Sequence, residues 1–313
     1  MSVEAQTQIQ RAPVALPVVH SDLVRRQMRL AWWLLSPSLL VVALVALIPL
    51  LQTIYQSFTN ERLASARAVS FVGLKNYADL LTDDAFRHSI WITFLFTVLT
   101  VSFELVLGMG IALVVNSNFK GRGPMRAAML VPWAIPTVVS TQIWKWMYHD
   151  IYGVINDLLV QRLHILSSNV AWVADPATSI PALAAVDIWK ATPFMALLLL
   201  AGLQLIPSDI YEAADVDGAN PVQQFLTLTL PLLRPALIVA LIFRTLDALR
   251  AFDVFYVMFG NRSDTQSMGV YAQQNLVAFS DLGYGGAISV AIFLIIAIFV
   301  VTYVTIFKVE AAS

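Results

Sequence analysis

EAADVDGANPVQQFLTLTLP, from Glu212 to Pro231, is a polar segment that lies between two long apolar runs. Ser208 is placed to cap a helix that begins at Asp209, and an acidic first turn suits the positive end of a helix dipole. Gly218 is expected to end that helix, because glycine adopts the left-handed conformation without steric cost. The segment is therefore predicted to begin with a short helix that stops at a glycine.

A second helix start follows this glycine directly. Asn220 is a favoured N-cap residue, Pro221 suits the first helical position, and Gln223 completes a capping box. Pro231 and Pro235 are expected to close this second helix before the next apolar run. The sequence predicts a helix–glycine–helix unit, which capping alone would not distinguish from an ordinary well-capped surface loop.

The rest of the chain is unusually apolar. Of its 313 residues, 58% are hydrophobic and only 12% are charged, and the mean hydropathy is +0.74; soluble domains are about 45–50% apolar. About 20 apolar residues cross a hydrocarbon core, and the absence of two-residue alternation favours helices over barrel strands. The sequence therefore predicts an all-α integral membrane protein with six crossings, centred on Leu30–Leu51, Ile90–Val115, Met129–Met147, Ile180–Leu205, Ala236–Phe259 and Ala287–Phe307.

The basic residues outside these crossings indicate an orientation, because cytoplasmic loops are enriched in Lys and Arg. If the N-terminus is cytoplasmic, the inner side carries Arg11, Arg25, Arg26, Arg29, Lys120, Arg122, Arg126, Arg234 and Lys308. The outer side then carries Arg62, Arg67, Lys75, Arg87, Arg162 and Arg262. We therefore expect both termini to be cytoplasmic, with a partly disordered tail over 1–29, the six-helix membrane domain over 30–307 and a short C-terminus over 308–313.

The composition disfavours several kinds of chemistry. The chain has no cysteine, which excludes disulfides, thiol catalysis and thiolate metal sites. Its four histidines fall in tails, loops or crossing ends, without a histidine–carboxylate cluster at metal-ligand spacing. It contains neither a GxxxxGK[ST] phosphate-binding motif nor a basic patch suited to nucleic acid. An enzyme, a metal or cofactor site and a nucleic-acid partner are all poorly supported.

Ionisable groups inside the predicted crossings are functional candidates, because charge is costly in a membrane. Arg244, Asp247, Arg250 and Asp253 recur every three residues with alternating sign, so they are expected to share one broad face of the fifth helix. Two interpretations stay open: a self-neutralised ladder that holds helices together, or direct contact with a ligand. The full set is Glu104, Lys145, Asp187, Lys190, Arg244, Asp247, Arg250 and Asp253.

The polar segment also carries a motif. EAA, then Gly218 after three intervening residues, Leu228 and Pro231 resemble the coupling-loop signature (EAA motif) of ATP-binding-cassette (ABC) importer permeases, which usually have Ile in place of Leu228. FVGLKNYADLL, from Phe71 to Leu81, and FRTLDALRAFDVFY, from Phe243 to Tyr256, are similar to segments of carbohydrate permeases. From about Trp32 to Phe307 the chain most resembles maltose-type first permease subunits, and among them those of trehalose importers. It departs from them at FGNRSD, where the family often has a Gly-Gly-Pro turn.

This resemblance implies a type I ABC importer permease fold in a bacterial inner (plasma) membrane. It implies a transport subunit with no enzymatic activity, whose partners are a second homologous permease, two ATPase subunits that bind ATP and Mg, and an extracytoplasmic solute-binding protein. A disaccharide is the implied substrate, with trehalose first. The loop over 207–235 would couple to the ATPase as a rigid lever docked in a groove, through Glu212, Ala213, Ala214, Asp217, Gly218, Leu228 and Pro231.

The resemblance also implies a sugar site around the crossings that flank this loop. Carboxylate and guanidinium groups can complement sugar hydroxyls, and an aromatic ring can pack on the apolar sugar face. The implied residues are Lys190, Ala191, Phe194, Asp247 and Arg250, with Arg244 one turn away. Weaker candidates are Trp133, Gln142, Trp144 and Trp146, because tryptophan at a crossing end is more typical of the interfacial belt.

Three further expectations concern structure and mechanism. Glu104 is expected to bond a neighbouring helix rather than substrate, and Pro132, Pro136 and Pro193 are expected to kink their helices. The external segment Tyr148–Ser179 is long enough to contact a binding protein. The main alternative is an ion-coupled secondary transporter that uses the charged fifth helix, although inverted repeats are not evident in the sequence.

Overall fold

The computed structural model describes residues 22–63, 65–66 and 68–307, and the chain divides into two units, residues 1–52 and 53–313. The first unit consists of α1 (Asp22–Val42), a π-helical turn η1 (Ala43–Leu47) and most of α2 (Ile48–Gln56). The π turn ends at Leu47, two positions before Pro49. Pro49 has no backbone N–H to donate to the preceding turn, which favours an irregular helix at this point. Val24–Gln56 is long and apolar enough to cross a membrane.

The expected terminal segments are only partly within the described residues. Residues 1–21 and 308–313 lie outside them. From Asp22 onward the chain is helical, so the first helix begins before Leu30, where the first crossing was expected.

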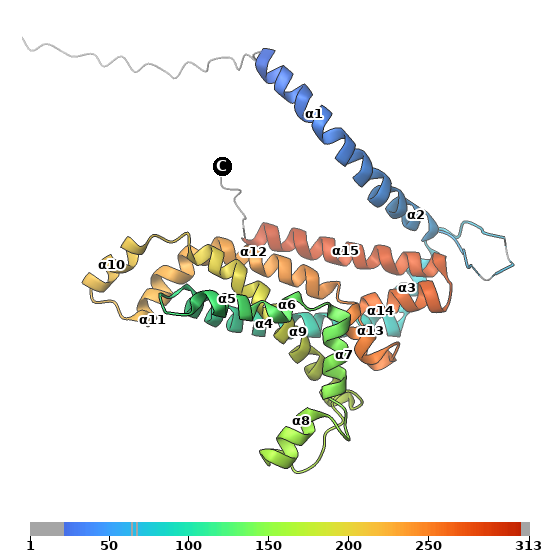
Figure 1. Cartoon of the computed structure of the whole chain (residues 1–313). Coiled ribbons are helices and arrows are strands. Elements are labelled where there is room, and N and C mark those ends of the chain that lie inside the picture. The colour runs from blue at the N-terminus through green and yellow to red at the C-terminus, as the bar shows by residue number, and fades with distance from the viewer. Residues whose placement is uncertain (1–21, 64, 67, 308–313) are drawn as a thin grey trace, which may run out of the picture. The chain divides into compact units, whose positions relative to one another are not determined.

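The second unit is built around four long helices that pack side by side (Figure 1). They are α4 (Asp84–Asn116), α9 (Pro176–Leu203), α12 (Leu230–Leu249) and α15 (Leu282–Phe307). Glycines allow the closest approaches. A Cβ placed on Gly202 of α9 would lie 2.4 Å from the Cβ of Ala236 on α12, and one on Gly108 of α4 would lie 2.7 Å from Cγ of Met195. Small residues at such crossings let helix backbones approach in a membrane.

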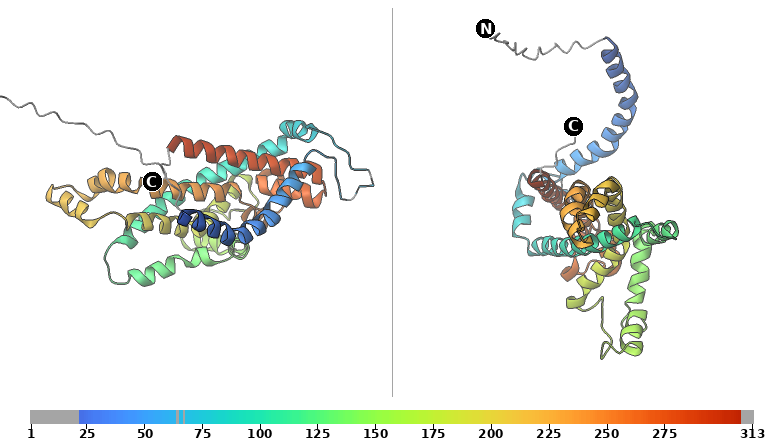
Figure 2. Two further views of the ribbon diagram at one scale, coloured as in Figure 1. Left: turned by 90° about the horizontal axis from the view of Figure 1, so that it is seen from above. Right: turned by 90° about the vertical axis from the view of Figure 1, so that its left-hand side faces the viewer.

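Shorter elements complete this unit. The loop over 207–235, which the sequence analysis predicts to be a coupling loop and which is given that name below, lies with α5 at one end of the long helices. The helices α3 and α14 lie at the other end, as both Figure 1 and Figure 2 show. Apart from two isolated bridges, the described residues contain no β structure. The elements are α3 (Lys75–Thr82), α5 (Arg122–Met129), α6 (Val131–Ala134), α7 (Thr137–Met147), α8 (Val154–Asn156), η2 (Asp157–Arg162), α10 (Ser208–Val216), α11 (Pro221–Gln224), η3 (Phe225–Thr229), α13 (Asp253–Phe259), η4 (Ser263–Thr265), α14 (Met268–Gln273) and η5 (Gln274–Ala278).

The third predicted crossing is broken. Arg122–Ala134 and Thr137–Met147 are inclined by 87°, and five further spans are long and apolar enough to cross, so the predicted six is reached if the bent pair is one span. The break lies at Ile135 and Pro136. Ile135 has an extended ψ of 131°, as expected for a residue that precedes proline. Of the three prolines expected to kink helices, Pro136 interrupts its span outright, whereas Pro193 lies inside α9.

The fifth predicted crossing differs from expectation at both ends. Pro231 and Pro235 do not close a helix, because the chain continues from α11 through the π segment η3 into α12. Pro231 directly follows the π-helical segment η3, and such a local change of helix type can accommodate a residue that has no N–H to donate. At the other end α12 stops before Arg250, and Asp253 begins α13. The four charged residues of the predicted ladder therefore do not share one continuous helix.

Candidate functional site

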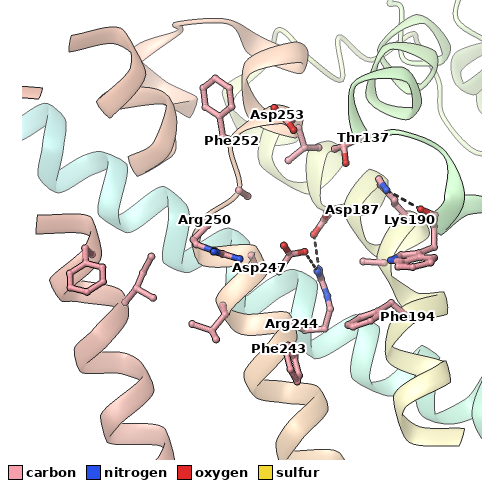
Figure 3. Close-up of a pocket in the computed structure, with 18 residues that line it drawn as sticks. Thr137, Asp187, Lys190, Phe194, Phe243, Arg244, Asp247, Arg250, Phe252 and Asp253 are labelled. Atoms are coloured by element: carbon pink, nitrogen blue, oxygen red, sulfur yellow. Dashed lines mark hydrogen bonds and ion pairs between the residues drawn. The ribbon is translucent and has the colours of Figure 1, made fainter. Parts of the chain in front are cut away.

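A cavity of about 760 Å³ lies beside the break in the third span (Figure 3). Residues of α6, α7, α9, α12, α13 and α15 line it, together with the link between α12 and α13. All six residues that the resemblance implied for a sugar site border this one cavity: Lys190, Ala191, Phe194, Arg244, Asp247 and Arg250. Of the weaker candidates Trp133 also lines it, whereas Gln142, Trp144 and Trp146 do not.

Arg244 is the electrostatic centre of the cavity wall. Its Nε donates to Glu104 Oε2 at 2.6 Å, and its Nη2 donates to Glu104 Oε1 at 2.7 Å and to Asp187 Oδ2 at 3.1 Å. Its Nη1 donates to Asp247 Oδ2 at 2.6 Å. The guanidinium therefore joins α4, α9 and α12. Because buried charges are costly unless they are paired and hydrogen-bonded, this arrangement explains how four ionisable groups are accommodated here.

The four Arg244 bonds show which charged side chains of the cavity wall are already paired and buried, and which of them a ligand could still reach. Glu104 bonds a neighbouring helix, as predicted, and its side chain is 0% exposed. Asp247 pairs with Arg244 in the manner of the predicted ladder, yet 69% of its side chain is exposed. Arg250 and Asp253 also line the cavity and form no ion pair with any residue that the structure describes. Structural pairing and accessible charge therefore coexist in the same wall.

An aromatic surface faces the charged groups. The rings of Trp133 and Phe194 stack with centroids 5.9 Å apart and planes 12° apart. Lys190 Nζ donates to the backbone carbonyl of Trp133 at 3.4 Å, at the end of α6 where the broken span leaves carbonyl groups without helical partners. Lys190 thus fixes the break next to the cavity, a role that sequence spacing could not indicate.

The coupling loop has the local structure that its sequence predicts at its centre. Gly218 adopts a φ of +77°. Asn220 Oδ1 accepts from the backbone N–H of Gln223, and Gln223 Oε1 accepts from that of Asn220, both at 2.9 Å. Ser208, however, is the first residue of α10 rather than its cap, and its hydroxyl contacts only the neighbouring Asp209.

Side-chain contacts hold the two halves of this loop together. The Tyr211 hydroxyl lies 3.0 Å from Thr229 Oγ1, and Gln224 Nε2 donates to Asp215 Oδ1 at 2.6 Å. Among the predicted coupling residues, Ala214 is buried and Leu228 is partly buried, whereas Glu212, Ala213, Asp217, Gly218 and Pro231 are exposed.

Sequence reasoning missed the apolar tip of this loop. Val216 is 87% exposed and Val222 is 66% exposed. In the sequence, the signal that could have indicated this apolar tip was the position of these two valines next to polar residues.

One buried amide organises the segment Tyr148–Ser179, which the sequence analysis expected to be external and which is called the external segment below. Asn156 Nδ2 donates to the carbonyls of Asp150 at 3.0 Å and Val170 at 2.9 Å. Its Oδ1 accepts from the Val170 N–H at 3.2 Å and from Trp172 Nε1 at 2.8 Å. The segment is therefore folded around Asn156, which the sequence analysis did not single out.

The FGNRSD turn, where the sequence departs from the family pattern, also has a defined structure. Gly260 adopts a φ of +66°. Arg262 Nη1 donates to the Val173 carbonyl at 2.5 Å, and its guanidinium lies 4.9 Å from the centroid of the Phe259 ring. The turn is thus attached to the external segment. Across the described part of the chain, no group of three or more His, Asp or Glu side chains is arranged to hold a metal ion.

Comparison with known proteins identifies the class to which this fold and cavity belong. Residues 104–309 match the family model described as "Binding-protein-dependent transport system inner membrane component". The chain therefore belongs to this family of transport components. The fold is that of the ABC importer permeases, and within them the chain belongs with the carbohydrate permeases. The protein is thus a multi-pass subunit of the inner membrane.

Two relatives match across most of their length. The chain is 42% identical to the sulfoquinovosyl glycerol transport system permease protein SmoG of Agrobacterium fabrum, over 84% of this chain and 85% of that protein. It is 41% identical to the trehalose/maltose transport system permease protein MalF of Thermococcus litoralis, over 90% of this chain and 95% of that protein.

A solved structure shares the fold. It is the crystal structure of a bacterial ABC transporter involved in the import of the acidic polysaccharide alginate, with a TM-score of 0.79 at 20% identity. The match covers 93% of this chain and 98% of the other chain. Family membership favours an ABC importer subunit over an ion-coupled transporter, and it agrees with the expectation that the chain itself is no enzyme.

Proposed function

We propose that this chain forms one half of the translocation pathway of an ATP-driven disaccharide importer, with trehalose as the first candidate substrate. The second half would be a homologous permease, and ATP and Mg would bind to two separate ATPase subunits. A relative named for trehalose/maltose transport, at 41% identity, supports this substrate. A structural neighbour solved as an alginate transporter in complex with a periplasmic protein supports an extracytoplasmic solute-binding protein as a partner.

The observation that carries the proposal is the composition of the 760 Å³ cavity. Its volume lies within the range of about 300–1,000 Å³ that is common for small-molecule sites. The stacked Trp133 and Phe194 offer an apolar surface for a sugar ring, and the exposed Asp247 carboxylate offers acceptors for hydroxyl groups. Arg250 supplies donors from the same wall.

The coupling role rests on a different part of the molecule. Two hydrogen bonds join residues before Gly218 to residues after it: Tyr211 to Thr229, and Gln224 to Asp215. The loop over 207–235 can therefore act as a short stiff lever. Its exposed Val216 and Val222 would enter an apolar groove on the ATPase, and Glu212 would pair with a basic residue there. Nucleotide-driven movement of the ATPase subunits would then reorient the helices as bodies.

The proposed orientation places this loop in the cytoplasm, with both termini on the same side. Basic residues support it. Lys120, Arg122 and Arg126 lie in and before α5, which begins at the same end of the long helices as the coupling loop (Figures 1 and 2). Since positive residues are enriched on the cytoplasmic side, the loop would face an ATPase located there.

Uptake by the assembled transporter tests the substrate site. Labelled trehalose uptake should be inhibited by unlabelled disaccharides, with maltose and sucrose compared against monosaccharides. Asp247→Ala and Arg250→Ala should abolish uptake while assembly with the ATPase persists. Asp157→Ala and Arg162→Ala are matched controls, because these exposed residues pair with each other outside the cavity. Unchanged sugar affinity and rate in the two cavity variants would refute the site.

A second experiment tests the energy source. Membrane vesicles that contain the complex should take up sugar when ATP and the binding protein are supplied, and should not respond to a proton or sodium gradient alone. Uptake driven by an ion gradient in this chain without an ATPase subunit would instead establish the alternative of a secondary transporter.

A further inference from the structure

The cavity contains three cations, but Arg244, the most buried of them, has almost no capacity left for a ligand. A guanidinium has five N–H groups. Four donor–acceptor bonds already link Arg244 to three carboxylates, and its side chain is 3% exposed. An anionic group on a substrate therefore has no free guanidinium to meet at this position.

The other charges do not change this conclusion. Lys190 and Arg250 are the remaining cations of the lining, and Asp187, Asp247 and Asp253 are carboxylates of the same lining. Glu104 lies directly behind Arg244 and adds a fourth carboxylate. Three cations therefore stand against four carboxylates, which leaves one negative charge in excess. A carboxylate or sulfonate could meet Arg250, but it would enter a wall that carries one negative charge in excess, whereas the hydroxyl groups of an uncharged sugar would find acceptors there.

Glu104 is central to this balance although it cannot touch a ligand. Its side chain is fully buried, and it accepts two of the four Arg244 bonds. We propose that Glu104 is a specificity-determining residue that acts through Arg244: by occupying the guanidinium from behind, it makes the cavity select uncharged sugars over anionic ones. This inference rests on the proposed function, since it assumes that sugars enter the cavity.

The decisive variant is Glu104→Gln, which keeps the size of the side chain and one oxygen that can accept from Arg244, while its amide nitrogen cannot accept the second of the two bonds. The variant removes one negative charge, while Asp187 and Asp247 continue to neutralise the guanidinium. The complex is therefore expected to assemble and to bind trehalose with little change. Affinity for an anionic sugar should rise about tenfold, because a unit charge within several ångströms acts strongly in a buried site.

The measurement is equilibrium binding to the purified complex in lipid nanodiscs. The binding protein is left out, so that any difference in affinity between the two sugars comes from the membrane cavity. The matched ligands are trehalose and the same disaccharide with one hydroxymethyl group oxidised to a carboxylate. Asp253→Asn is the charge control, because it also removes a carboxylate from the cavity but does not contact Arg244. It is expected to raise affinity for the anionic sugar by less than Glu104→Gln does.

Each outcome decides the inference. The inference is supported if the unaltered complex binds trehalose more tightly than the anionic sugar, and if this difference in affinity shrinks in Glu104→Gln and shrinks less in Asp253→Asn. Three results overturn it: equal binding of both sugars by the unaltered complex, no gain in Glu104→Gln, or an equal gain in both variants, which would make net charge alone responsible. Binding of trehalose in any of these cases leaves the proposed function intact, whereas a complex that binds and transports no sugar refutes both.

Discussion

The Tyr211 hydroxyl and the Thr229 hydroxyl lie 3.0 Å apart and connect α10 to the π segment η3 across the Gly218 turn. If the loop transmits movement from an ATPase, this bond contributes to its stiffness. Tyr211→Phe should leave assembly intact but lower the amount of sugar transported per ATP by up to about fivefold, since one hydrogen bond contributes about 1 kcal/mol. The measurement is the ratio of uptake to ATP hydrolysis in proteoliposomes.

Thr227→Val is the control for this prediction. Thr227 lies on the same segment, but it is exposed and its hydroxyl donates only to Gln223 O within its own helix. Its removal should not change the ratio. Thr229→Val also removes the bond that Thr229 Oγ1 donates to Gln224 O at 3.4 Å. Thr229→Val combined with Tyr211→Phe should therefore be no worse than Thr229→Val alone, because the bond between the two hydroxyls is already lost in that variant. Additive losses would show that the bond is not the cause.

Gly218 provides a sharper test of the same lever. Its φ of +77° is strained for other residues, yet a Cβ added there would meet no atom within 4 Å. Any effect of substitution must therefore come from the backbone. Gly218→Val should uncouple ATP hydrolysis from uptake while the complex still assembles, because a β-branched residue disfavours this conformation strongly. Gly218→Asn is the control, since asparagine tolerates the left-handed region and should retain most of the coupling. Normal uptake by Gly218→Val would contradict the proposed lever.

The pairing of Arg244 makes a separate prediction about stability. Arg244→Leu leaves Glu104, Asp187 and Asp247 close together without their cation. Removing one partner from a buried ionic group costs about 3–5 kcal/mol, so the purified protein should melt at a much lower temperature. Glu104→Leu added to Arg244→Leu should recover part of this loss.

An exposed ion pair gives the comparison. Arg87 pairs with Asp84 at the start of α4, and both side chains are largely exposed. Arg87→Leu should change stability by no more than about 1 kcal/mol. If Arg244→Leu behaved like Arg87→Leu, the buried network would not be the element that holds α4, α9 and α12 together.

Local sequence chemistry determined the features that were predicted correctly. The Asn220–Gln223 capping box and the turn at Gly218 depend on residues within a few positions of each other, so their side chains specify them directly. Pro231 was misinterpreted because the sequence did not show that the π-helical segment η3 precedes it and lets α11, η3 and α12 form one continuous path.

The remaining features depend on contacts that are distant in the sequence. Glu104 and Arg244 are separated by 140 positions, and one chain gives no measure of which buried charges will meet. The break after α12 contains no proline or glycine. Instead the Ser267 hydroxyl donates to the Ala251 carbonyl at 2.9 Å. In a continuous helix this carbonyl would accept from a backbone N–H of the next turn. The six residues that the resemblance implied all border one cavity, but the resemblance did not show that the Arg244 guanidinium already bonds three carboxylates.

The external segment gives a prediction that does not depend on transport. Asn156 is buried and uses both amide hydrogens and its oxygen to bond four groups on three residues. Asn156→Asp removes the two donors and should loosen the segment, so limited proteolysis should cut between 148 and 179 in the variant. Asn169→Asp is the control, because Asn169 is exposed and makes a single bond to Asp150 O. Equal protection of both variants would show that Asn156 does not organise the segment.

A final prediction concerns pH and the N-terminal end of α4. Asp83 Oδ1 caps this helix by accepting from the N–H groups of Ala85 and Phe86, and Oδ2 accepts from the hydroxyls of Tyr271 at 2.5 Å and Tyr284 at 2.6 Å. Burial alone would raise the pKa of this carboxyl, but the hydrogen bonds outweigh burial and hold the pKa below its ordinary value. Burial and the Asp83 contact raise the pKa of Tyr271 to about 12, so that Tyr271 remains a donor at neutral pH.

The sign of the effect on stability follows from these directions. Because folding lowers the pKa of Asp83, its contribution is fully present above the unfolded value of about 3.9 and is lost as the pH falls through the lower folded value. Asp83→Asn should therefore reduce the melting temperature at pH 7 and flatten its decline below about pH 4. Asp84→Asn is the matched control, since Asp84 is exposed one position later and should leave that decline unchanged. If Asp83→Asn retained the full acid-dependent decline, carboxylates elsewhere would be responsible for it.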